Sequence, residues 1–157
     1  MSVYKSRRGE AKVQYLADAR ELLIFTIRNL RRFPPSYGPV LTNDILRLAN
    51  AVHDHVVQAN KIYLCRETPR ADFIARHNLL VQAYGENDAL RKKLSILYEV
   101  VDEGQNFLKS KEQYMKMFKR WGELANAVDA HTGAVIKSDL ARWKGYQAER
   151  EERAAGV

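Results

Sequence analysis

A chain of 157 residues is long enough to bury one hydrophobic core, so we expect a single domain over residues 1–157. The single cysteine excludes an internal disulfide, and no apolar stretch approaches the roughly 20 residues of a membrane span. The net charge of +7 and the lack of an apolar run after the basic N-terminus therefore predict a basic, cytoplasmic protein.

The first predicted helix ends at two consecutive prolines. Its apolar residues recur at steps of three and four, which places them on one face of a helix. They are Leu16, Ala19, Leu23, Ile27, Leu30 and Phe33. Pro34 and Pro35 cannot continue a helix, and together with Gly38 they predict a tight reversal.

The second predicted helix follows this turn and runs to a loop around Cys65. Its apolar face consists of Leu41, Ile45, Leu48, Val52, Val56, Ala59 and Tyr63. The third predicted helix starts at Thr68 and Pro69, a capping side chain followed by a proline at the first helical position. Its apolar face, which also includes the polar residues His77 and Asn87, consists of Phe73, Leu80, Tyr84, Leu94, Leu97 and Val101.

The fourth predicted helix opens with a capping box, in which Ser110 caps and Gln113 reaches back. One apolar register then continues through Tyr114, Met117, Trp121, Leu124, Val128 and Val135. The register passes Gly133 unshifted, so we expect one long helix to about Glu149, at a cost of about 1 kcal/mol for the glycine. A break at residues 131–133 is the alternative. We expect the tail, residues 147–157, to be frayed or a solvated helix end.

Short connections make consecutive helices antiparallel, which predicts an all-α, up-down-up-down four-helix bundle with a long C-terminal helix. The first and fourth helices are then neighbours. Residues 1–35 hold 8 basic and 3 acidic side chains, residues 36–106 hold 8 and 9, and residues 107–157 hold 10 and 7. The bundle would therefore bring the two basic ends of the chain together, which suits a polyanion, although a basic surface also serves solubility.

No residue pattern indicates catalysis, a metal or a cofactor. His53 and His55 point about 200° apart on a helix, and His77 lies on an apolar face. His131 has no acidic or cysteine partner at ligand spacing, and no nucleophilic-cysteine motif surrounds Cys65. Phosphate-binding glycine loops are absent too. We therefore expect a protein that is not an enzyme.

The basic residues offer a candidate binding surface for RNA or DNA. At about 100° per residue, four lysines share the outer face of the fourth helix, namely Lys116, Lys119, Lys137 and Lys144. On the first helix, Arg28 and Arg32 form an outward pair and Arg31 lies at the edge of the apolar face, with Arg7, Arg8 and Lys12 upstream. A solvated charged face is the alternative interpretation.

Ile24 and Phe25 lie off the main apolar face of the first helix. A helix that is apolar on more than one side often buries a second face, so these residues predict an oligomer interface. The alternative is that Ile24 packs on the flank of the bundle and Phe25 is exposed.

Several segments together resemble a bacterial family. They are VYKSRRGEAK near the start, the segment from Ala19 to Pro34, Ala59-Asn60-x-Ile62-Tyr63, Trp121-Gly122-Glu123, and Ile136-Lys137-Ser138-Asp139-x-x-Arg142. The chain is similar over nearly its whole length to the four-helix-bundle proteins that include the accessory variability determinant of diversity-generating retroelements.

The resemblance implies a basic pentameric barrel that binds a reverse transcriptase and its template RNA and assists cDNA synthesis without catalysing it. It also implies residues that contact nucleic acid or polymerase, namely Arg28, Arg31, Arg32, Lys119, Lys137 and Arg142. The competing hypothesis is a module for protein interaction or oligomerisation with no nucleic-acid role.

Overall fold

The computed structural model describes residues 3–101 and 110–156, with side chains from Gln14 onward. In these residues the secondary structure is helical and no strand occurs. The four long helices are α1 (Val3–Leu30), α2 (Asn43–Lys61), α3 (Arg70–Val101) and α4 (Lys111–Ala155). The all-α prediction is confirmed.

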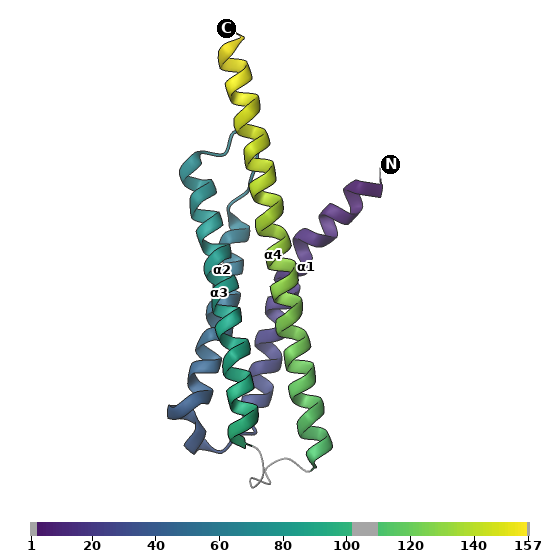
Figure 1. The fold of residues 1–157 in the computed structure, drawn as a ribbon, viewed down its shortest axis with the longest axis vertical. Coiled ribbons are helices and arrows are strands. Elements are labelled where there is room, and N and C mark those ends of the chain that lie inside the picture. The colour runs from purple at the N-terminus through teal and green to yellow at the C-terminus, as the bar shows by residue number, and fades with distance from the viewer. Residues whose placement is uncertain (1–2, 102–109, 157) are drawn as a thin grey trace.

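The four helices form an up-down-up-down bundle (Figure 1). Helix α1 packs between α2 and α4, and α3 packs on the other side between the same two helices. The expected contact between the first and last helices is therefore present. The C-terminal turns of α4 extend beyond the other helices, and the first turns of α1 diverge from the bundle (Figure 1).

The buried face of α1 differs from the predicted one. The residues that are buried are Tyr15, Asp18, Ala19, Leu22, Thr26, Asn29 and Phe33. Ile27, which we placed in the core, is 42% exposed. The observed face can include polar residues because their hydrogen bonds are satisfied. Thr26 donates to the Leu22 carbonyl at 2.7 Å, Asn29 donates to the Phe25 carbonyl at 2.8 Å, and Asp18 hydrogen bonds to His131.

The reversal at the prolines is confirmed. A 3₁₀ turn at Pro35–Tyr37 and a π turn at Gly38–Thr42 lead directly into α2. The apolar face of α2 is buried as expected from Leu41 to Ala59. Tyr63 was wrongly assigned to it, because α2 ends at Lys61 and the Tyr63 side chain is 74% exposed.

Thr68 closes the α2–α3 connection instead of capping α3. Its hydroxyl accepts from the Cys65 amide at 2.8 Å and donates to the Tyr63 carbonyl at 3.1 Å. Within α3, Asn87 is fully buried and donates to the Ala125 carbonyl of α4 at 2.9 Å. Tyr84 is not a core residue as predicted, because its side chain is 39% exposed.

Helix α4 is one helix that passes Gly133 without a break, as expected. Its cap is also confirmed, since the Ser110 hydroxyl accepts from the Gln113 amide at 3.2 Å. Residues 147–155 continue the helix, and nearly all of them are exposed. Of the two expectations for the tail, the structure has a solvated helix end and not a frayed one, up to Ala155.

Candidate nucleic-acid interface

Three arginines gather where α1 ends. Arg28 lies in the last turn of the helix, and Arg31 and Arg32 lie in the turn that follows. All three side chains are exposed. None of them forms an ion pair or hydrogen bond with another residue that the structure describes. Their guanidinium groups are therefore available to an external anion, in agreement with the outward orientation expected from the sequence.

Contacts between α1 and α4 show which part of α4 lies next to these arginines. Asp18 hydrogen bonds to His131, and further along α1 Thr26 accepts from the Trp121 indole at 2.9 Å. The two helices are therefore antiparallel, so later residues of α1 lie beside earlier residues of α4. Arg28 and Arg32 consequently lie level with the first turns of α4, which carry Lys116 and Lys119. We call the end of the bundle formed by residues 28–32 and 111–122 the basic end.

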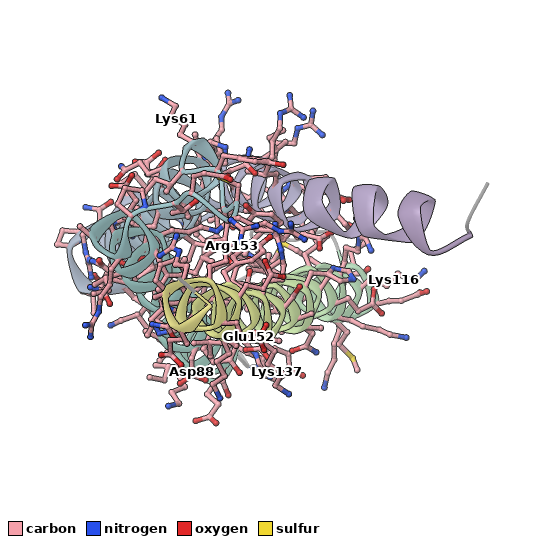
Figure 2. All side chains as sticks on the ribbon, turned by 90° about the horizontal axis from the view of Figure 1, so that it is seen from above. Lys61, Asp88, Lys116, Lys137, Glu152 and Arg153 are labelled. Carbon is pink, nitrogen blue, oxygen red and sulfur yellow. The ribbon has the colours of Figure 1, made fainter. Side chains whose placement is uncertain are left out.

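The predicted lysine face of α4 is exposed at all four positions, Lys116, Lys119, Lys137 and Lys144. Lys116 forms an ion pair with Glu112 at 2.9 Å, whereas the other three pair with no carboxylate in the described part of the chain. Lys116 and Lys137 point away from α4 in different directions (Figure 2). At about 100° per residue, Lys119, Lys137 and Lys144 share one row along α4, and Lys116 is turned about 60° from Lys119 and Lys137. The four lysines extend over about 42 Å of helix.

Arg142, a nucleic-acid contact implied by the resemblance, is partly buried and forms hydrogen bonds within the chain. It donates to the Leu64 carbonyl at 2.6 Å and to the Tyr146 hydroxyl at 3.2 Å. Arg150, one helix turn beyond Tyr146, donates to the Thr68 carbonyl at 2.9 Å. Both guanidinium groups bind the connection between α2 and α3. We call the end of the bundle formed by residues 59–76 and 139–150 the closed end.

A buried ion pair at the closed end was not predicted. The Arg76 side chain donates to Asp139 at 2.5 Å, and these side chains are 8% and 4% exposed. Arg76 also donates to the carbonyls of Ala59 at 3.0 Å and Ile62 at 3.1 Å. It therefore adds a second donor to the Ala59 carbonyl, which also accepts from the Ile62 amide at 3.1 Å, and it supplies a donor to the Ile62 carbonyl just beyond the end of α2. The available signal was position: Arg76 lies between Phe73 and Leu80 on the apolar face of α3.

Tyr15 of α1 borders this ion pair and is fully buried. Its hydroxyl hydrogen bonds to the Asn60 amide oxygen at 3.1 Å. Burial raises the pKa of Tyr15, since the phenolate would lose its hydration. Nearby Arg76 acts in the opposite direction, and the Asp139 charge adds to the rise. The closed end is thus a structural polar network with a neutral tyrosine at its border.

Several residues that carry the family resemblance belong to this network. Ala59 and Asn60 of α2 and Ile62 just beyond it supply acceptors, and Asp139 and Arg142 supply groups from α4. These motifs therefore specify how the helices are joined.

Phe25 and Ile24, the predicted oligomer interface, are both partly buried. The Phe25 ring lies edge-on to Trp121, with ring centroids 6.0 Å apart, and packs against the main core. The sequence alternative of an exposed Phe25 is wrong. Phe25 therefore contributes to contact between α1 and α4 within one chain.

Two of the four histidines, His55 and His131, pair with carboxylates on neighbouring helices. His131 hydrogen bonds to Asp18 of α1, and His55 lies 2.7 Å from Glu86 of α3. Sequence spacing missed both pairs because they join different helices. Among the described residues, no group of three or more histidine, cysteine or acidic side chains could hold a metal ion.

Arg7, Arg8 and Lys12 lie outside the residues whose side chains the structure describes. None of the described helices is long and apolar enough to span a bilayer.

Comparison with known proteins gives no match to a family model, a curated protein or a solved structure.

Proposed function

We propose that the chain is a non-enzymatic accessory protein that binds nucleic acid through its basic end. As the family resemblance implies, its partner is the reverse transcriptase of a diversity-generating retroelement, and its working form is a homo-oligomer, a pentamer. The observation that supports nucleic-acid binding is the group of Arg28, Arg31 and Arg32, which is exposed and has no carboxylate partner among the described residues.

Binding of this kind depends on phosphate groups. Guanidinium groups bind phosphate oxygens through paired, charge-assisted hydrogen bonds, and each contact releases condensed counterions. Helix α4 adds Lys119 next to the arginines and Lys137 and Lys144 further along. Contacts to phosphate carry no sequence information, so we expect sequence-independent and strongly salt-dependent binding.

The test is a titration of labelled RNA at several salt concentrations. Replacing Arg28, Arg31 and Arg32 by glutamine should weaken binding at low salt and reduce the slope of log K against log salt by about 2 on a single strand. The matched control replaces Lys61, Arg70 and Arg153 by glutamine, because these residues are also exposed and unpaired within the described chain. The proposal is wrong if the wild type binds weakly without a salt slope, or if both triple variants behave alike.

The polymerase partner needs a separate test. A reverse transcriptase gene and a variable repeat beside this gene would support the proposal, and the encoded enzyme should then co-purify with the chain. Absence of such a gene would remove the retroelement role while leaving nucleic-acid binding intact.

A protein-interaction module remains the second candidate, and one observation favours it. Residues 77–85 of α3 and 130–136 of α4 contain no lysine, arginine or acidic residue, and contacts such as Tyr84 with Gly133 place them side by side. Val81 is 46% exposed and Leu140 is 36% exposed near this uncharged surface. Changing Lys116, Lys119, Lys137 and Lys144 to glutamate distinguishes the candidates. It should abolish RNA binding under the first, and leave assembly and function unchanged under the second.

A further inference from the structure

A groove between α3 and α4 borders the basic end. It has a volume of about 500 Å³, within the usual range for ligand sites. Phe118 and Gly122 line it from α4, and Arg91, Lys92, Ser95 and Tyr98 line it from α3.

The aromatic wall of this groove is rigid. Tyr98 stacks on Tyr114 with ring centroids 5.1 Å apart, and Phe118 meets Tyr98 edge-on at 5.3 Å. Phe118 also contacts the fully buried Trp121 at 5.7 Å. Tyr98 and Phe118 are nevertheless only partly buried, so part of each ring remains open to the groove.

Gly122 makes the groove accessible. A Cβ atom at this position would meet no atom within 4 Å, so the space in front of the helix is open. A glycine inside a helix is less favourable than alanine by about 1 kcal/mol. Nothing in the packing of α3 against α4 requires this glycine, which leaves the open space itself as its structural consequence.

Cations connect the groove to the basic end. Around the outside of α4, the helical repeat places Lys119 between Lys116, on the α1 side, and Gly122, on the α3 side. Across the groove, Arg91 forms a long ion pair of 3.5 Å with Asp129, and exposed Lys92 pairs with Asp88 at 2.7 Å. Exposed pairs of this kind are weak and exchange readily with other anions.

We propose that this groove holds an unpaired base of a single-stranded nucleic acid, stacked against Phe118 and Tyr98. The inference rests on the proposed function and adds its substrate class. Phosphates would follow the cations from Arg28 across Lys119, and one base would turn into the groove between α3 and α4. Asp88 also lines the groove, where it pairs with Lys92. Arg91 and Lys92 on the α3 rim, Lys119 beside the α4 rim, an aromatic wall and the hydroxyl of Ser95 suit a nucleotide better than an apolar side chain of a protein partner.

A larger side chain at residue 122, which would fill the groove, tests whether the groove holds a base. Gly122→Leu should weaken binding of a labelled oligo-adenosine strand about ten-fold, the effect of losing one stacked base, and leave binding of a blunt RNA duplex of equal length unchanged. A strand containing 2-aminopurine should lose fluorescence on binding the wild type, and lose less on binding the variant. Gly145→Leu is the matched control, because Gly145 also faces open space on α4 but lies far from the groove.

Thermal unfolding shows whether the variants fold, and Gly122→Leu should be at least as stable as the wild type. Equal single-strand binding by Gly122→Leu and wild type would overturn the base site, while a remaining salt slope would still support the proposed function. Unchanged RNA binding with lost binding of the reverse transcriptase would assign the groove to a protein side chain and also overturn the inference. A wild type that binds neither RNA would reject the proposed function itself.

Discussion

The two ends of the bundle use arginine in opposite ways. At the closed end, Arg76, Arg142 and Arg150 donate to backbone carbonyls and a buried carboxylate within the chain. At the basic end, the side chains of Arg28 and Arg32 donate to no acceptor among the described residues. Arg120, also at the basic end, pairs with Glu21 of α1 at 2.8 Å. Arginine therefore joins helices at the closed end, whereas the arginines at the end of α1 remain available to a ligand. Local charge density alone does not distinguish these two roles, whereas the acceptors nearby do.

The ion pair of the closed end should give the largest effect on stability. Arg76→Met leaves the buried Asp139 carboxylate with only the long Arg142 contact at 4.0 Å, and it removes the side-chain donor to the Ala59 and Ile62 carbonyls. We expect a loss of about 3–5 kcal/mol in unfolding free energy, measured by urea denaturation. The double variant Arg76→Met with Asp139→Leu should recover part of this loss. A loss below about 1 kcal/mol for the single variant would contradict a structural role.

A variant at Arg142 tests the difference between an arginine that bonds within the chain and one that binds a ligand. The resemblance implied a ligand contact at this residue. Arg142→Gln removes the hydrogen bond to the Leu64 carbonyl and should cost about 1–2 kcal/mol in unfolding free energy. RNA affinity and its salt slope should stay unchanged. Exposed Lys144 is the matched comparison two residues away, and Lys144→Gln should reduce the salt slope without changing stability. A reduced salt slope for Arg142→Gln together with a stability loss for Lys144→Gln would contradict these two roles.

Much of the fold was predictable because apolar spacing marks helices directly. The proline reversal, the Ser110 cap and the continuity of α4 through Gly133 all follow from local pattern. The buried face of α1 was not predictable in this way. Apolar spacing takes only apolar residues into account, whereas Thr26 is buried and hydrogen bonds to a carbonyl of its own helix. Such a residue looks exposed in sequence and is buried in the structure.

The candidate site was predictable only in part, for a related reason. Exposure of Arg28 and Lys119 follows from their positions relative to the apolar faces. The fate of Arg142 depends on the Leu64 carbonyl, 78 residues away, and on how the α2–α3 connection folds over α4. The groove at Gly122 depends in turn on the packing of α3 against α4, which no local pattern contains.

Helix α4 runs from the basic end to the closed end. A substitution at Gly133 tests whether the helix is continuous at this residue. Gly133→Ala should raise the unfolding free energy by up to about 1 kcal/mol, since the glycine lies inside a helix. The added methyl group would lie 3.4 Å from the half-exposed Tyr84 ring, an ordinary contact distance. Gly85→Ala in α3 is the control, because its Cβ would face open space. Destabilisation by Gly133→Ala alone would indicate a non-helical conformation at residue 133 in solution.

The smallest expected effect on stability is at the basic end. Replacing Arg28, Arg31 and Arg32 by glutamine removes no contact within the described chain. Two small terms also oppose each other: a cation in the last turn of α1 is favourable by about 0.3–1 kcal/mol, and like charges three or four residues apart are unfavourable by about 0.2–0.5 kcal/mol. We therefore expect urea denaturation to give an unfolding free energy within about 0.5 kcal/mol of the wild type. Added RNA should raise the melting temperature of the wild type more than that of the variant, because only ligand bound to the folded state stabilises it. A loss above about 1.5 kcal/mol without RNA would mean that these arginines hold the fold together, as those of the closed end do.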